Sequence, residues 1–150
     1  VSFNQDIMIQ SEDLNLFSTK NFKIVSKRKP TSKQLKDLIF AFNVCRYVKS
    51  NAIVLASNET TVGIGSGQPS RLDSCQIAIN KMKKFNLQND NLVAASDAFF
   101  PFVDGIEKLV QSGVRAVVQP SGSIRDKEII NFANETDTVL VFSKTRHFRH

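Results

Sequence analysis

The spacing of hydrophobic and polar residues changes at Pro30, where a weakly patterned lead-in gives way to regular periods. Residues 1–30 alternate only weakly, which indicates an extended, strand-containing segment that packs on something else. After the proline, Thr31 and Gln34 form the capping-box pattern of a helix start. Apolar residues at helical spacing then predict a helix that ends near Lys49, with one face made of Leu35, Leu38, Ile39, Phe42, Cys45 and Val48.

A hairpin and a second helix are predicted in the following stretch. The runs NAIVLAS and TTVGIGS are rich in strand-forming residues and are joined by the dipeptide NE, which favours a hairpin. Ser70 and Asp73 in SRLD resemble another capping box, which opens a helix that runs to about Phe85. Ile77 and Met82 lie on its apolar side, and lysines in its last turn suit the negative end of the helix dipole.

The second half of the chain alternates between apolar strands and amphipathic helices. The strands are LVAAS, VRAVVQP and TVLVFS. The helices are DGIEKLVQSG, stopped by Gly113, and SGSIRDKEIINFANE, capped by Ser123 with Asp126 at its third position. Continuous apolar strands alternating with helices indicate a parallel βαβαβ half that is covered on both faces. With the hairpin added to the same sheet, we predict a three-layer α/β domain with a mixed sheet.

Composition agrees with one soluble domain. The chain has 150 residues, of which 41% are hydrophobic, and no window approaches the roughly 18 consecutive apolar residues of a membrane helix. The first residues lack the pattern of a secretory signal. Cys45 and Cys75 lie in helical patterns without a C-x-x-C spacing, so we interpret them as small buried hydrophobic residues in a reducing cytoplasm.

The net charge of +6 leaves three interpretations open. Nucleic-acid binding, binding of a small polyanion such as a phosphate or polyglutamate, and a merely basic surface all explain a modest excess. The basic residues are scattered over SKRKP, KMKK and KTRHFRH. Nucleic-acid binders usually concentrate such charge on one face with interleaved aromatic residues, so we expect no nucleic-acid partner and no membrane partner.

The glycine-rich segment GIGSGQ at 63–68 is not a known nucleotide motif. Its G-x-G-x-G spacing differs from the dinucleotide fingerprint, and no Gly-Lys-Ser/Thr follows. The glycines would let a ligand approach the backbone ahead of a helix N-terminus, or they would simply form a tight turn between strand and helix. Both interpretations stay open.

Zinc hydrolysis and triad chemistry are excluded by the residues present. Both histidines, His147 and His150, lie at the C-terminal end, and neither cysteine is near a metal-ligand pattern. The H-x-E and P-C-x-x-C signatures of zinc deaminases are missing from the sequence, and so is the G-x-S-x-G of a nucleophile elbow. We therefore expect neither zinc hydrolysis nor a nucleophilic triad.

The segment ASDAFFPFVDG at 95–105 follows a predicted parallel strand, at the edge where open α/β sheets bind ligands. Its three phenylalanines cannot all face one core, so some of them would form a stacking wall for a flat heterocycle. Asp104 would accept hydrogen bonds from that heterocycle or would cap the next helix. The terminal KTRHFRH reaches the same edge, where it offers a phosphate-binding arginine and an aromatic ring, or else an unstructured tail.

Five motifs occur together and in order: KSNAIV, VGIGSGQPSR, ASDAFFPFVDG, QPSGSIRD and RHFRH. This pattern resembles the C-terminal part of the AICAR transformylase domain in the family of bifunctional AICAR transformylase/IMP cyclohydrolases. The resemblance covers residues 31–150, and residues 1–30 match only loosely. It implies a cytidine-deaminase-like fold without zinc, with residues 1–30 as an extended lead-in that packs on the rest of a longer parent protein.

The family transfers a formyl group from 10-formyltetrahydrofolate to the exocyclic amine of AICAR, which gives FAICAR, and a partner domain closes FAICAR to IMP. The resemblance therefore implies a cytoplasmic formyltransferase of purine biosynthesis with AICAR and folate as ligands. It also implies a homodimer of the full-length protein. The second activity, IMP cyclohydrolase, belongs to a domain that these residues do not contain.

Site residues follow from the matching motifs. AICAR would contact Asn51 through its carboxamide or reacting centre, and would contact Phe99, with Arg146 and Phe148 on its phosphate side. The residues that would line the folate pocket, with the aspartate meeting the pterin, are Leu72, Pro101, Phe102 and Asp104. In some family members a monovalent cation such as potassium lies near residues that match Ser50 and Asp97.

The family's catalytic lysine–histidine pair lies upstream of every motif found here. Lys49 is not that lysine, and neither terminal histidine is that histidine. We therefore expect about the last third of a longer protein, which supplies binding surface and orientation but no general base and has little or no activity alone. The alternative, from another class, is a non-catalytic basic domain that binds nucleic acid or a protein partner.

Overall fold

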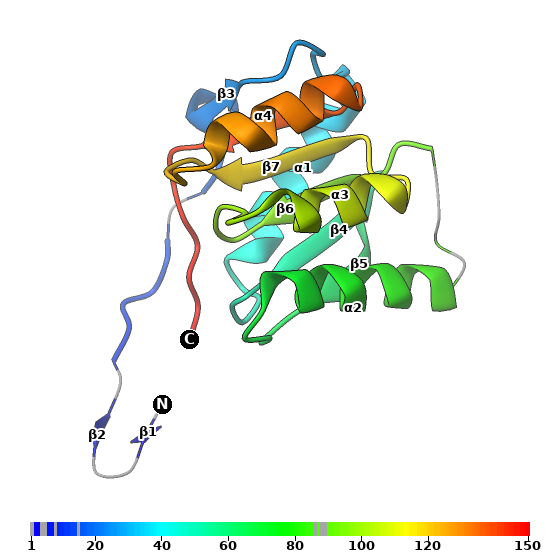
Figure 1. Ribbon diagram of the computed structural model, residues 1–150. Coiled ribbons are helices and arrows are strands. Elements are labelled where there is room, and N and C mark those ends of the chain that lie inside the picture. The colour runs from blue at the N-terminus through cyan, green and yellow to red at the C-terminus, as the bar shows by residue number, and fades with distance from the viewer. Residues whose placement is uncertain (1, 4–5, 8, 15, 86, 88–89) are drawn as a thin grey trace.

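Three layers make up the protein in the computed structural model, which describes residues 2–3, 6–7, 9–14, 16–85, 87 and 90–150 (Figure 1). A six-stranded sheet forms the middle layer, with strand order β3–β8–β7–β6–β4–β5. The strands are β3 (Phe22–Ile24), β4 (Ile53–Ser57), β5 (Thr60–Gly65), β6 (Val93–Ser96), β7 (Ala116–Pro120) and β8 (Val139–Ser143). Strands β6, β7 and β8 are parallel, and the other three pair antiparallel. The predicted α/β class, the parallel half and the antiparallel hairpin are confirmed.

Four helices cover the two faces of the sheet. The helices are α1 (Ser32–Cys45), α2 (Arg71–Lys84), α3 (Val103–Gln111) and α4 (Asp126–Glu135). One core lies between the sheet and helices α2, α3 and α4, and includes Ala94 and Val117. The other lies beneath α1 and includes the next residue of each strand, Ala95 and Val118. Because both faces are buried, these strands are mostly apolar, which explains the nearly continuous apolar runs in the sequence.

Part of the lead-in packs on this domain itself. Phe17 is buried beneath α1, and β3 pairs with the edge strand β8. A short 3-10 helix, η1 (Thr19–Asn21), connects the two. Strands β1 (Ser2–Phe3) and β2 (Asp6–Ile7) pair antiparallel and project away from the body (Figure 1). What the exposed residues of this arm pack against stays a prediction.

The first capping box is confirmed, but α1 ends earlier than predicted. Gln34 N donates to Thr31 Oγ1 at 3.1 Å, and Thr31 N donates to Gln34 Oε1 at 3.0 Å. The helix ends at Cys45 rather than near Lys49 because the next amides bond three residues back, in tighter turns. Ser70, at the start of α2, makes no side-chain capping bond, so the second capping box is wrong. An aspartate at its third position is one methylene shorter than the usual Glu or Gln.

Two further helix starts differ from the prediction. Helix α3 has Phe102 at its N-cap, so Asp104 lies in the first turn, where its carboxylate accepts a bond from Gly105 N at 2.7 Å. Helix α4 begins at Asp126 rather than after Ser123. The Asp126 carboxylate reaches back to the amide of Gly122 at 2.8 Å, as an acidic side chain does at the positive end of a helix.

The hairpin turn is formed by Asn58 and Glu59, as predicted. Both have positive φ, 53° and 51°, which matches the twist of the paired strands. The carboxylate of Asp37 on α1 accepts their amide protons at 3.1 and 2.6 Å. Asp37 is 1% exposed, so helix α1 holds the turn through a buried charged group.

The two thiols are free and completely buried, as predicted. Burial raises the pKa of Cys45 well above its ordinary value, with Asp97 adding to the effect. Burial also raises the pKa of Cys75 to about 12. Both thiols are therefore neutral in the folded protein over the ordinary pH range.

These raised pKa values predict a loss of stability in alkali. Below pH about 8.5 the thiols are neutral in both states, and above it only the unfolded chain ionises them. We expect the free energy of unfolding to fall by up to about 1.4 kcal/mol per pH unit for each thiol as pH rises toward the folded pKa. Urea unfolding between pH 8 and 10.5 measures this. The double variant Cys45→Ala/Cys75→Ala loses that slope, and an equal slope in it contradicts the assignment.

Across the part of the chain that the structure describes, no helix combines the length and the apolar character needed to cross a membrane.

Candidate functional site

Four segments that are distant in sequence meet at the carboxyl edge of the parallel strands. They are the turn before β4 (49–51), the loop before α2 (66–70), the turn after β6 (97–102) and the tail after β8 (144–150). In Figure 1 the tail leaves β8 and runs down past the arrowhead of β7. His147 N donates to Asp97 O at 3.0 Å, and Ser50 N donates to Arg149 O at 2.9 Å. The tail is therefore ordered against the edge, in agreement with the predicted gathering of the motifs.

Arg71, at the first position of α2, joins three of these segments. Its guanidinium donates to Asp97 Oδ1 at 2.9 Å, to Asn51 Oδ1 at 2.8 Å and to Phe99 O at 3.2 Å. The Arg71 side chain is 9% exposed and that of Asp97 is fully buried. Burial lowers the pKa of Arg71, and the charge of Asp97 opposes that shift. A buried ion pair thus fixes the geometry of the edge.

Sequence reasoning did not single out Arg71. A signal was present, because a cation in the first turn of a helix opposes the helix dipole and needs another partner. Leu72, the neighbouring residue predicted for the folate pocket, is half-buried at the start of α2. Arg71, rather than Leu72, makes the hydrogen bonds that connect the start of α2 to the residues of the other motifs.

Asn51 is held by five hydrogen bonds, one of which the Ser74 hydroxyl donates to the backbone O of Asn51 at 2.8 Å. Its Nδ2 donates to Gln68 O at 2.9 Å and to Pro69 O at 3.0 Å, and its backbone N donates to Gln68 O at 3.2 Å. With Arg71 on Oδ1, both amide hydrogens and one lone pair of the side chain are in use. A ligand would therefore meet Asn51 at the second lone pair of Oδ1, or would displace one of these bonds.

Both oxygens of the Asp97 carboxylate are engaged. Arg71 occupies Oδ1, and the hydroxyl of Ser50 donates to Oδ2. Among the described residues no group of three or more His, Cys, Asp or Glu is placed to hold a metal. Ser50 and Asp97, which the resemblance connects with a monovalent cation, are hydrogen-bonded to each other. The Asp97 carboxylate is already paired with the cationic side chain of Arg71.

The Phe-rich turn separates its rings as predicted. Phe100 is 1% exposed. Its ring packs so closely on Gly105 that a Cβ added to the glycine would stand 2.6 Å from Cδ1 of the ring. Its backbone N donates to Gln119 Oε1 at 3.2 Å. Phe99 is half-buried and Phe102 is 52% exposed. The turn is thus anchored by one ring and presents another to solvent, beside the exposed Pro101.

The predicted phosphate-binding pair lies on the tail. Arg146 is exposed, and its guanidinium lies 5.1 Å from the centroid of the Phe148 ring. Between them His147 points inward: it is 1% exposed, packs on Phe42 with ring centroids 4.5 Å apart, and pairs through Nδ1 with Asp13. Phe148 also lines a cavity of about 500 Å³ between the tail and the arm. The buried histidine anchors the exposed Arg146 and the half-buried Phe148 that flank it.

The structure argues against ligand approach, one of the two interpretations left open for the glycine segment at 63–68. A Cβ on Gly63 would stand 2.2 Å from Ala78 O, and one on Gly65 would stand 1.9 Å from Ser74 O. Both contacts are with the backbone of α2, so these glycines let the helix pack closely on β5 rather than let a ligand approach. The tight-turn interpretation is favoured, with Gly67 at φ +67° in the turn itself.

The fold and the edge cluster define a class: an α/β domain with polar and aromatic residues gathered in loops at the carboxyl ends of its parallel strands, the edge where such sheets bind ligands. Sequence comparison narrows this class. The model of the AICARFT/IMPCHase bienzyme family matches residues 1–81. The chain is 46% identical over 144 residues to a bifunctional purine biosynthesis protein PurH from Persephonella marina. The aligned segment covers 96% of this chain and 28% of that protein. The chain therefore belongs to the AICARFT/IMPCHase bienzyme family, and it spans little more than a quarter of that relative's length.

Proposed function

We propose that this chain is the substrate- and folate-binding part of a formyltransferase of purine biosynthesis, which transfers the formyl group of 10-formyltetrahydrofolate to AICAR. Family membership supports the proposal, as does the printed name of the relative. The observation that carries it is the Arg71 cluster. One guanidinium ties Asn51 and the backbone of Phe99 to one edge, so residues matched to AICAR binding lie together.

The arrangement supports separate places for the two ligands. Asn51 and Phe99 are half-buried at the edge, and Arg146 lies exposed on the tail beside the half-buried Phe148, which suits a nucleotide with an outward phosphate. The matched folate residues Pro101, Phe102 and Asp104 are exposed in the turn after β6 and at the start of α3. The folate would pack on the aromatic ring of Phe102, and the carboxylate of Asp104 would accept hydrogen bonds from its pterin.

The chain supplies binding and orientation in this proposal, and the general base comes from elsewhere. His147 is buried and paired with Asp13, so it is not placed to take a proton from a ligand. The family's lysine–histidine pair would come from the remainder of a longer protein, which would also carry the IMP cyclohydrolase domain and form the homodimer.

Potassium has no step in the proposal, because the Asp97 carboxylate, which the resemblance connects with it, is already paired. The single negative charge of Asp97 is balanced by Arg71, and both carboxylate oxygens accept hydrogen bonds. This arrangement does not supply a free anionic oxygen ligand for a cation.

Ligand binding and turnover of the full-length protein test the proposal. We expect AICAR and folate to bind in calorimetry, and Arg146→Ala to weaken AICAR about tenfold or more, because a charge-assisted bond to phosphate is lost. Arg115→Ala, which changes an exposed arginine at the amino end of β7, is the matched control. Residues 1–150 alone should show no turnover. Salt-dependent binding of a random oligonucleotide without folate or AICAR binding would favour a basic binding domain instead.

A further inference from the structure

Phe102 and Arg125 form an exposed pair that the core does not explain. Phe102 is 52% exposed although its neighbour Phe100 is buried. The guanidinium carbon of Arg125 lies 4.9 Å from the centroid of the Phe102 ring. The phenylalanine follows β6 and the arginine follows β7, so the carboxyl ends of two neighbouring parallel strands supply one aromatic face and one cation.

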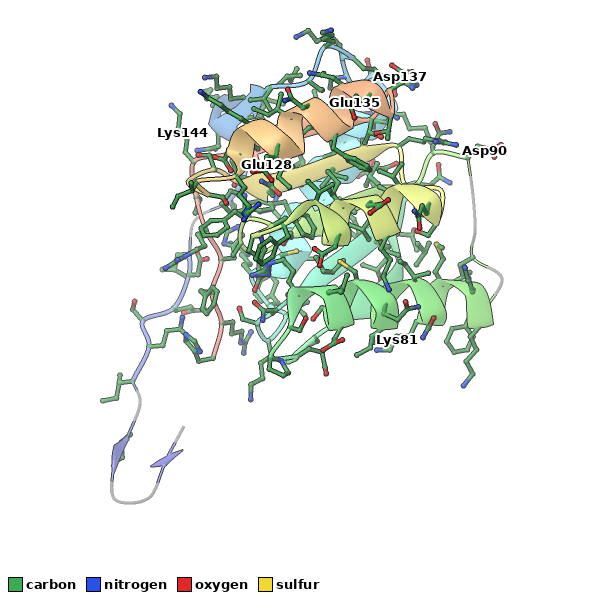
Figure 2. All side chains as sticks on the ribbon, in the orientation of Figure 1. Lys81, Asp90, Glu128, Glu135, Asp137 and Lys144 are labelled. Atoms are coloured by element: carbon green, nitrogen blue, oxygen red, sulfur yellow. The ribbon has the colours of Figure 1, made fainter. Side chains whose placement is uncertain are left out.

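The intramolecular partner of Arg125 is easily exchanged. Nη1 of Arg125 lies 3.1 Å from Oε2 and 3.3 Å from Oε1 of Glu128 on α4, which Figure 2 labels. The two side chains are 47% and 54% exposed. Water and salt screen such a pair, so it contributes little to stability. A carboxylate from a ligand can therefore take the place of Glu128 at small cost.

An acid and a base accompany Phe102. The exposed carboxylate of Asp104, two residues along the chain, offers acceptors. Over the ring, from the loop before α4, Arg125 offers donors and a positive charge. A folate has the complementary groups, since its donor-rich pterin is joined through an aminobenzoyl ring to the carboxylates of glutamate. The acid, the ring and the base thus offer one partner for each part of the ligand.

We propose that Phe102 and Arg125 bind the aminobenzoyl-glutamate end of the folate, and that Arg125 makes the protein select folates with a glutamate tail over pteroates without one. The aminobenzoyl ring packs against the exposed part of Phe102, and a glutamate carboxylate accepts hydrogen bonds from Arg125 in place of Glu128. This inference rests on the proposed function and adds the residue that reads the tail.

Titration of the full-length protein with folic acid and pteroic acid tests the inference, because pteroic acid lacks the glutamate with its two carboxylates and keeps a single carboxylate, which is fixed on the ring that packs against Phe102. We expect the unsubstituted protein to bind folic acid about tenfold tighter, the effect of a charge-assisted pair at an exposed site. Arg125→Gln should weaken folic acid to the level of pteroic acid and leave pteroic acid unchanged. Glu128→Gln frees the arginine and should keep or improve folic acid binding, and Arg115→Gln should change neither ligand.

The outcomes separate this inference from the proposed function. If the unsubstituted protein binds both ligands, and Arg125→Gln weakens both equally or neither, the tail assignment is wrong while folate binding stands. If the unsubstituted protein binds neither ligand, the proposed function falls and this inference with it. Phe102→Leu should weaken both ligands, since both contain the ring that packs there, and a loss confined to folic acid would contradict the placement.

Discussion

Arg71→Met is expected to lower the free energy of unfolding by about 3–5 kcal/mol, because it leaves the fully buried carboxylate of Asp97 without its cation. The methionine keeps much of the volume of the side chain, so the loss reports on charge and hydrogen bonds rather than on a cavity. Three acceptors from two segments lose their donor at once, namely Asp97 and the carbonyl of Phe99 after β6, and Asn51 before β4. Urea unfolding followed by circular dichroism measures the change.

Two companion variants give this measurement its controls. Arg71→Lys keeps the charge but cannot form the three-pronged contact, so it should lose less than the methionine and still lose ligand binding. The double variant Arg71→Met/Asp97→Asn removes both charges and should be more stable than the single methionine variant, which a double-mutant cycle shows as coupling. A loss of less than about 1 kcal/mol in Arg71→Met would mean that the pair is effectively solvated.

Gly65→Ala is expected to destabilise the protein by about 3 kcal/mol or more, at the upper end for overpacking. The new Cβ would stand 1.9 Å from Ser74 O and 2.8 Å from Ser74 Cα. These are backbone atoms of α2, which no rotamer change can move, so the helix must shift away from β5. The midpoint of thermal unfolding and the urea midpoint both measure the loss.

Gly67→Ala is the matched control from the same segment. Its Cβ would meet only the side chain of Lys49, at 3.7 Å, so its cost is that of a positive φ, about 1–2 kcal/mol. A Gly65→Ala protein that keeps its full stability but no longer binds ligand would return the ligand-approach interpretation to the glycine segment.

The architecture was predictable because burial on two faces leaves a simple mark. In β6 and β7 every residue is buried, and the sequence shows the same apolar runs between amphipathic helices. The turn at Asn58 and Glu59 was predictable because short polar dipeptides between β-rich runs have few other roles. The signals for these elements lie in consecutive residues, so local pattern is sufficient to predict them, although Asp37 on α1 also holds the turn.

Helix starts and the centre of the candidate site were less predictable, because both depend on distant partners. Asp104 is of a residue type that favours the N-cap, but helix α3 begins one residue before it and Phe102 takes the cap position. By pattern Arg71 is an ordinary surface-type residue. Its importance appears only in the fold, where it contacts Asn51 and Asp97, which are 20 and 26 residues away in the sequence. Periodicity carries no information on such closures.

That separation has a consequence for the order of folding. Asn51 precedes β4, Arg71 follows β5 and Asp97 follows β6, so the ion pair can form only after the hairpin, α2 and the central strand have docked. Partly folded forms would lack the Arg71 cluster at the carboxyl edge altogether, rather than keep it with weakened contacts. A ligand that binds there recognises only the finished state, and it raises the melting temperature in proportion to the logarithm of its concentration.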